Sequence, residues 1–149
     1  MLWGRAMQIQ PHLSFEGRCE EAVEFYRKAV GAEVTFMARF KDIPGPQPPG
    51  SIPPGGENKI MHTSFRIGDS VLMASDGHCS GKSGFQGFQL AIQVKDAATA
   101  DRVFDALSEG GQVKMPLMQT FWSPRFGMVT DKFGVEWMVN VDTGRPQTK

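Results

Sequence analysis

The feature that most constrains the fold of this chain is an internal repeat. The sequence HLSF at 12–15 corresponds to QLAI at 89–92, and GDSVLM at 68–73 corresponds to GVEWM at 134–138. The first correspondence has an offset of 77 residues and the second of about 65, a difference that a proline-rich insertion in the first half explains. A chain of 149 residues suffices for one domain, so the repeat predicts two small units that share a core.

In the first unit, hydrophobic periodicity predicts the order β-α-β-β-β. The expected elements are strands at 8–15, 32–40, 59–67 and 71–75 and a helix at 19–30. Within the first strand Ile9, Leu13 and Phe15 alternate with polar residues, which predicts one buried and one polar face. Gly31 follows the apolar stripe of the helix and is typical of a helix end.

The second unit repeats this order. The expected elements are strands at 86–94, 112–118, 125–130 and 135–141 and a helix that begins after Asp96. Asp96 is a favourable N-cap residue, and Gly110 and Gly111 end the helix. The last two strands form a hairpin around a turn at 131–134. In the second strand of the hairpin one side is apolar and consists of Val135, Trp137 and Val139. The other side is mixed and consists of Glu136, Met138 and Asn140.

Three segments fall outside these elements. Residues 1–6 precede the periodic pattern and are interpreted as an N-terminal extension without a structural role. The loop at 44–58 is rich in Pro and Gly, so it is neither helix nor sheet interior; it is either a flap over a pocket or a disordered insertion. The segment 76–85 is a polar linker, in which GHCSGKS falls one residue short of a phosphate loop. One domain then spans 7–149, with units at about 7–76 and 85–142.

Composition excludes several classes of protein. The 16 basic and 16 acidic side chains balance and no basic run contains aromatic residues, which argues against nucleic-acid binding. No apolar run reaches the roughly 18 residues that span a bilayer, and no secretory signal is recognisable. Cys19 and Cys79 form neither a redox motif nor a zinc motif, and two free thiols suit a reducing compartment. We therefore expect a cytoplasmic protein that binds neither membrane nor nucleic acid.

Each helix is expected to cover one side of its sheet, and the other sides carry mostly polar rows. These rows are Gln10, His12 and Ser14; His62, Ser64 and Arg66; Gln89, Ala91 and Gln93; and Glu136, Met138 and Asn140. Paired together, they would line one curved trough for a small molecule. Trp122 and Arg125 flank the last hairpin and offer a ring face and a positive charge to an aromatic or anionic ligand. The alternative is that Trp122 belongs to the core and Arg125 to the surface.

Several motifs resemble a known family. GRCEEAVEFY at 17–26, Met61-His62, Phe121-Trp122 and DKFGVEW at 131–137 resemble the PhnB-like branch of the vicinal oxygen chelate superfamily. That superfamily includes glyoxalase I, extradiol dioxygenases and the fosfomycin and bleomycin resistance proteins. The resemblance covers about residues 8–142 and implies an α+β fold: two βαβββ modules that form a curved, mostly antiparallel sheet trough with helices on the outer face. It also implies a homodimer.

The resemblance bears on a possible divalent metal cofactor. Metal-using relatives carry a His on the first strand of each unit and a carboxylate on the last. The matching positions here are His12, Met73, Gln89 and Met138, of which only His12 is a strong ligand for a divalent ion. A partial site of His12, His62 and Glu136 requires their strands to converge; otherwise both histidines are structural.

Two classes of function remain open at this point. The first is a glyoxalase-like protein that binds a small molecule and performs metal-assisted lyase or isomerase chemistry. The second is a non-catalytic protein that sequesters its ligand, as the resemblance to resistance proteins allows. The candidate ligand-binding residues are His12, His62, Arg66, Gln89, Trp122, Arg125, Glu136 and Met138. No catalytic residue is assigned, and no glycine-rich turn of the kind that binds S-adenosylmethionine follows the first strand of either unit.

Overall fold

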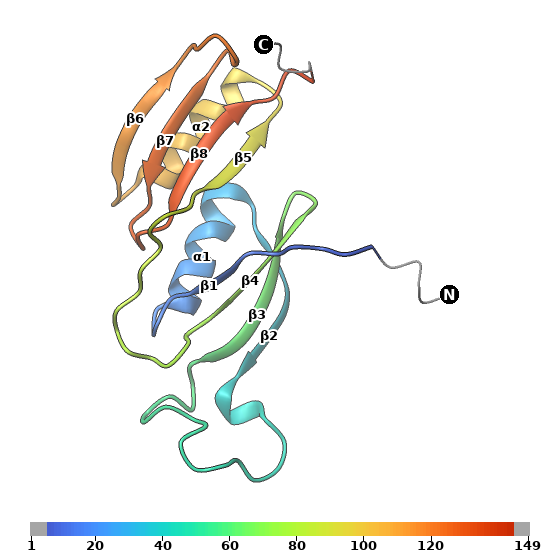
Figure 1. Ribbon diagram of the computed structural model, residues 1–149, viewed down its shortest axis with the longest axis vertical. Coiled ribbons are helices and arrows are strands. Elements are labelled where there is room, and N and C mark those ends of the chain that lie inside the picture. Colours follow the sequence, from blue (N-terminus) through green and yellow to red (C-terminus); the bar gives the residue numbers. More distant parts are fainter. Residues whose placement is uncertain (1–5, 145–149) are drawn as a thin grey trace.

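Each half of the chain forms a four-stranded sheet with one helix packed against it (Figure 1). The structure, a computed structural model, describes residues 6–144. The first unit contains β1 (His12–Ser14), α1 (Cys19–Val30), β2 (Glu33–Arg39), the short 3₁₀ helix η2 (Phe40–Asp42), β3 (Ile60–Ile67) and β4 (Ser70–Ser75). The second contains β5 (Leu90–Val94), α2 (Ala97–Ser108), β6 (Gln112–Met118), β7 (Phe126–Thr130) and β8 (Glu136–Val141).

The two sheets have the same topology. Their strand orders are β1-β4-β3-β2 and β5-β8-β7-β6, so the first strand of each unit lies beside its last strand. That pair is parallel, and the other neighbours are antiparallel. The repeat and the α+β class expected from the sequence are therefore confirmed. None of the helices formed by residues 6–144 is both long and apolar enough to cross a bilayer.

Helix boundaries follow the predicted signals closely. Gly31 ends α1 in the left-handed conformation, with φ of 70°, which glycine adopts without steric cost. Asp96 caps α2 by accepting a hydrogen bond from the backbone N–H of Thr99 at 2.8 Å. The buried stripe of α2 consists of Ala100, Val103, Phe104 and Leu107. These short-range preferences explain why the helices were predictable.

The helices and the inner sides of both sheets share one core. Phe133, from the turn between β7 and β8, packs its ring against Phe15 and Phe25 of the first unit. Tyr26 of α1 donates a hydrogen bond of 2.6 Å to Asp131 in the same turn, and Trp137 donates another of 2.9 Å. The second unit is thus fixed to the first by buried contacts.

The first strands of both units are shorter than predicted. The strand expected at 8–15 begins only at His12, because Pro11 has no backbone N–H and only its carbonyl pairs, with the N–H of Met73 at 2.9 Å. Ile9, expected on the buried side, is fully exposed. The strand expected at 86–94 begins at Leu90, and Phe88 is 41% exposed. In both strands the alternation of apolar and polar residues extends beyond the residues that have a partner strand.

The connecting segments differ in how they are held. Residues 43–59, which include the Pro-rich loop, contain no helix or strand, and backbone hydrogen bonds from Phe40 to Lys59 and from Lys41 to Glu57 close the base of this loop. In the linker between the units, Phe85 is buried against Phe15 at 5.4 Å between ring centroids. Residues 1–5 of the expected N-terminal extension lie outside the described residues.

Candidate functional site

The side of each sheet that faces away from its helix is uncovered. We call the uncovered side of β1–β4 the first open face and that of β5–β8 the second open face. The first open face carries His12, Ser14, Phe36, His62, Ser64, Arg66 and Met73. The second carries Ala91, Gln93, Met118, Phe126, Met128, Thr130, Glu136, Met138 and Asn140. Most of the predicted polar rows therefore do lie on these faces.

On the first open face two histidines approach each other across the strands. The β1–β4 register makes His12 the Cα partner of Met73, and the β3–β4 register makes Ser64 the partner of Met73 on its other side. His62 lies two residues from Ser64, with 3.3 Å between its Nε2 and the Ser64 hydroxyl oxygen. The imidazole rings of His12 and His62 are nearly parallel, with centroids 6.2 Å apart. Both rings thus border the row that contains Met73.

The second open face is a surface of thioethers and aromatic rings. Ala91, Met138, Met128 and Met115 are successive Cα partners across its four strands, as are Gln93, Asn140, Phe126 and Met118. Trp122, in the connection between β6 and β7, packs edge-on against Phe126 with centroids 5.2 Å apart. Met118 and Met128 could not be assigned to this face from the sequence, because apolar side chains occupy both sides of β6 and β7 and hide the alternation.

Polar atoms interrupt this apolar surface, and two of them lack partners. The side-chain amide of Asn140 donates to the side-chain oxygen Oε1 of Gln93 at 2.7 Å. The Asn140 Oδ1 and Thr130 Oγ1 atoms are buried and find no hydrogen-bond partner within residues 6–144. Glu136 is the Cα partner of Thr130, at the other end of the face from Asn140. An unpaired buried acceptor is costly, so a donor from outside this chain would be stabilising here.

The two predicted arginines already have acidic partners. Arg66, at the edge of the first open face, forms an ion pair with Glu33 at 2.6 Å. Arg125 forms an ion pair with Asp101 of α2, on the helix side of its sheet. Gln89 is exposed and precedes β5. Neither arginine presents an unpaired charge to a ligand on the open faces.

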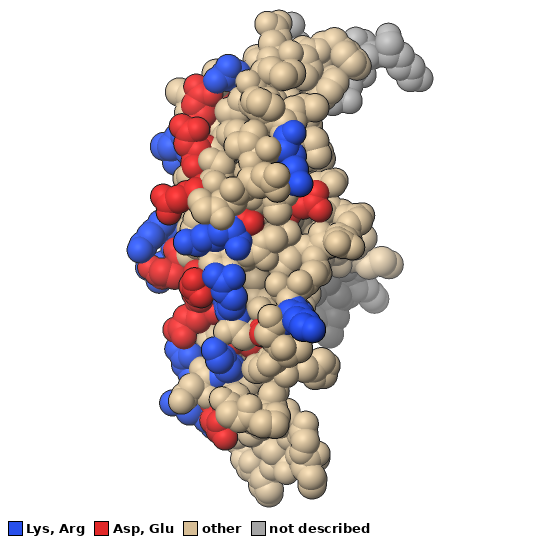
Figure 2. Space-filling view, turned by 90° about the vertical axis from the view of Figure 1, so that its left-hand side faces the viewer, with Lys and Arg blue, Asp and Glu red and all other residues tan. Residues whose placement is uncertain are grey.

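Charge is distributed unevenly over the molecule. Figure 2 shows Lys, Arg, Asp and Glu gathered along one edge and fewer along the opposite edge. Since this view looks at the left-hand side of Figure 1, the charged edge is the one that carries the helices. Exposed charged residues on the helices are Glu20, Glu21, Glu24, Arg27, Lys28, Arg102 and Asp105. The open faces lie on the side with less charge.

The donor atoms do not fit a hard divalent ion of the kind that the resemblance implies. Met138 has Ala91 as its partner on the first strand of the second unit, where Met73 has His12. Thioethers and a methyl group replace the expected carboxylates and second histidine, and such groups are poor ligands for divalent ions that prefer oxygen. Within residues 6–144 no three His, Cys, Asp or Glu side chains converge as a metal site. His12 and His62 lie on one sheet and Glu136 on the other.

A cleft lies between the units. The cleft, of about 730 Å³, is bordered by the segment 8–11, the turn between β3 and β4, β5, and the first half of α2. It is lined by side chains such as Gln10, Val71, Gln93 and Arg102. Ala91 and Gln93 are the lining residues that it shares with the second open face.

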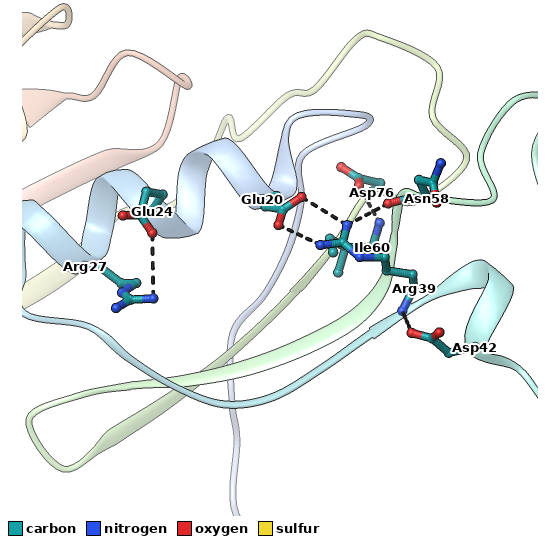
Figure 3. A network of polar contacts seen from close by, with 8 residues as sticks. All are labelled: Glu20, Glu24, Arg27, Arg39, Asp42, Asn58, Ile60 and Asp76. Atoms are coloured by element: carbon teal, nitrogen blue, oxygen red, sulfur yellow. Dashed lines mark hydrogen bonds and ion pairs between the residues drawn. The ribbon is translucent and has the colours of Figure 1, made fainter.

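A polar network around the buried Asp76 supports the first unit (Figure 3). Asp76, which is 1% exposed, accepts hydrogen bonds from the backbone N–H groups of Gly17, Cys19 and Ile60 at 2.7–2.9 Å. It thereby caps α1 from a distant part of the sequence. Arg39 binds Glu20 at 2.7 Å and the Asn58 carbonyl oxygen at 2.7 Å, and its hydrogen bonds lower the pKa of Glu20. This network fixes the base of the Pro-rich loop.

The chain consists of two βαβββ units, with both helices on one side and the uncovered sheet faces on the other. This arrangement defines a class of proteins built by duplication of one module. The chain belongs to the Glyoxalase/Bleomycin resistance protein/Dioxygenase superfamily, whose family model matches residues 9–139.

Individual proteins are similar to this chain over most of its length. The chain is 37% identical over 145 residues to protein YjdN of Escherichia coli, covering 94% of this chain and 99% of that protein. It is similar to the crystal structure of protein PA1353 from Pseudomonas aeruginosa, with 42% identity, a TM-score of 0.79 and coverage of 92% and 98% of the two chains. A structure described as a putative 3-demethylubiquinone-9 3-methyltransferase, PhnB protein, from Bacillus cereus has 27% identity, a TM-score of 0.73 and coverage of 91% and 100%.

Proposed function

We propose that this protein binds a small, largely uncharged molecule on its open sheet faces. The observation that carries the proposal is the unpartnered Asn140 Oδ1 within a surface of methionine and aromatic side chains. Such a surface adapts to an apolar ligand, and the amide oxygen selects one that carries a hydrogen-bond donor. The shortage of charge on this side of the molecule favours the same kind of ligand.

Co-purified ligand provides the test. Small molecules extracted from the purified protein and identified by mass spectrometry should be lost from a Met138→Lys variant, which places a charge in the middle of the second open face. A Glu109→Lys variant, altered on the exposed helix side, should retain them. Equal recovery from the two variants would contradict the proposed location, and circular dichroism would verify that both remain folded.

We propose that a second copy of the chain completes the ligand site. Each open face is half of a hollow, and exposed apolar side chains such as Phe36 (53%) and Met118 (46%) would be covered if the first open face of one protomer met the second open face of its partner. Light scattering should then give the mass of two chains. Phe36→Lys and Met118→Lys should shift the protein toward the monomer, whereas Glu109→Lys should not.

The second candidate function is metal-assisted lyase or isomerase chemistry. The pair of histidines on the first open face favours it, because imidazole groups can bind a metal or move a proton. Elemental analysis of the wild type and of His12→Ala would distinguish the two: stoichiometric zinc, manganese or iron lost in the variant supports an enzyme, and none in either supports a binding protein. The two thiols, Cys19 and Cys79, are free, which is consistent with our proposal of a cytoplasmic location.

A further inference from the structure

We propose that His12, His62 and Met73 form a binding site for a soft monovalent metal ion, copper(I), which silver(I) would replace. The proposal goes beyond the small-molecule function and does not depend on it, because all three residues lie on one sheet of one chain.

The strand register places the three residues on adjacent strands around one row of the first open face. Met73 lies in the centre of its row, with His12 as its Cα partner on β1 and Ser64 as its partner on β3. The 3.3 Å contact between His62 Nε2 and the Ser64 hydroxyl brings that imidazole to the same row. The ring centroids of His12 and His62 are 6.2 Å apart. An ion about 2 Å from the facing nitrogen of each ring would hold the two ring centroids roughly 6 Å apart.

The chemistry of these donors selects the ion. A thioether is a soft ligand that favours copper(I), and imidazole nitrogen also suits copper. Hard divalent ions prefer oxygen ligands, and the nearby acidic groups are already engaged. Glu33 is paired with Arg66, and Glu16 accepts hydrogen bonds from the Ser14 hydroxyl and the Ser80 N–H. The substitution of methionine for the expected carboxylate thus changes the preferred ion.

The second unit supplies an internal control for this inference. Met138 occupies the place in β8 that Met73 occupies in β4, but its partners are Ala91 and Met128. It offers the same thioether on the same kind of open face without an imidazole beside it. If thioethers alone sufficed to bind copper(I), the row of Met138, Met128 and Met115 would bind it as well.

Competition with a chromogenic copper(I) chelator, under anaerobic reducing conditions, tests the site. The measurement uses the full chain in a Cys79→Ser background, because the partly exposed thiol of Cys79 would compete for the ion. We expect one equivalent of copper(I) to bind. Met73→Leu, His12→Ala and His62→Ala should each weaken binding roughly tenfold or more, and Met138→Leu should leave it unchanged.

Spectra of protein with ¹³C-labelled methionine methyl groups provide an independent measurement and report on folding. Silver(I) should shift the Met73 resonance first, and one equivalent of zinc(II) should not displace it. The inference is overturned if Met73→Leu binds copper(I) as tightly as its parent, if Met138→Leu is equally impaired, or if zinc(II) competes effectively.

Discussion

Asp131 is the residue on which the junction of the two units most depends. Its buried carboxylate accepts hydrogen bonds from the Tyr26 hydroxyl, the Trp137 indole and the backbone N–H groups of Phe133 and Val135. Burial and the adjacent carboxylate raise the pKa of Tyr26, so its hydroxyl remains a donor at neutral pH. One side chain therefore joins α1, the last turn and β8.

Replacing Asp131 should destabilise the protein strongly. Asp131→Asn leaves at least one buried donor unpaired and should lower the free energy of unfolding by about 2–4 kcal/mol. Tyr26→Phe removes one hydrogen bond and should cost about 1–2 kcal/mol. Urea denaturation followed by circular dichroism measures both. Asp105→Asn, at an exposed position on α2, is the control; a loss at Asp131 no larger than this would show that the network is not stabilising.

The lowered pKa of Glu16 predicts how the stability of the fold depends on pH. Hydrogen bonds from Ser14 and Ser80 lower its pKa from 4.5 to about 2. Because the folded-state pKa lies below that of the unfolded chain, the ionised carboxylate stabilises the fold above about pH 4.5, and this contribution is lost as the pH falls toward about 2. Glu16→Gln should be less stable than the wild type at about pH 7, and the difference should narrow by about pH 3. Denaturation curves at both pH values measure this.

An exposed carboxylate elsewhere in the chain serves as the reference. Glu57→Gln, in the exposed Pro-rich loop, should leave the pH dependence as it is in the wild type. A constant difference between Glu16→Gln and the wild type at both pH values would contradict the assigned role.

At the scale of elements, the loop after β4 depends on a glycine at one position more than at another. Gly77 and Gly81 both have positive φ, of 54° and 79°. A Cβ at Gly77 would collide with the Glu16 carboxylate and the Ser14 hydroxyl, whereas one at Gly81 would meet nothing within 4 Å. Replacing either glycine by alanine therefore incurs the cost of a side chain at positive φ. Only the replacement of Gly77 adds a steric clash.

Two alanine variants separate these costs. Gly81→Ala should destabilise the protein by about 1 kcal/mol. Gly77→Ala should cost about 2 kcal/mol or more, because Glu16 must move and lose its hydrogen bonds. Thermal and urea unfolding of the two variants would measure the difference. Equal losses would show that the Glu16 side chain yields at no cost.

The two helices also differ in how far along the sequence their capping residues lie from them. The cap of α2 is Asp96, immediately before the helix, and was predictable from the helix-start pattern. The N–H groups at the start of α1 bind Asp76, which is 57 residues from Cys19. No local pattern identifies such a cap, because β4 must first be placed beside β1.

At the scale of the whole molecule, the shared core predicts that the two units unfold together. Phe133 of the second unit packs against Phe15, Phe25 and Tyr26 of the first. Phe133→Ala should lower the free energy of unfolding by about 3–5 kcal/mol while unfolding remains a single transition. Circular dichroism and tryptophan fluorescence should give coincident curves. Phe121→Ala, at a ring that is 94% exposed, is the control, and two separate transitions in the wild type would contradict the prediction.

The sequence alone determined the elements, their order and the duplication. These follow from local properties: the stripe of α2, the turn at 131–134, and the alternation of Val135, Trp137 and Val139, all of which are buried as predicted. Charge balance and the family motifs also depend on composition and spacing, which need no coordinates.

Only the tertiary structure decided which side chains meet. The pairing of Arg125 with Asp101, the approach of His62 to His12, and Ala91 rather than Gln89 as the partner of Met138 all depend on strand register and on contacts between distant segments. A shift of register by one residue moves every side chain of a strand to the other face, and hydrophobic alternation leaves shifts of two residues unresolved. Periodicity therefore determined which residues face outward, whereas the folded sheet determined which of them lie together.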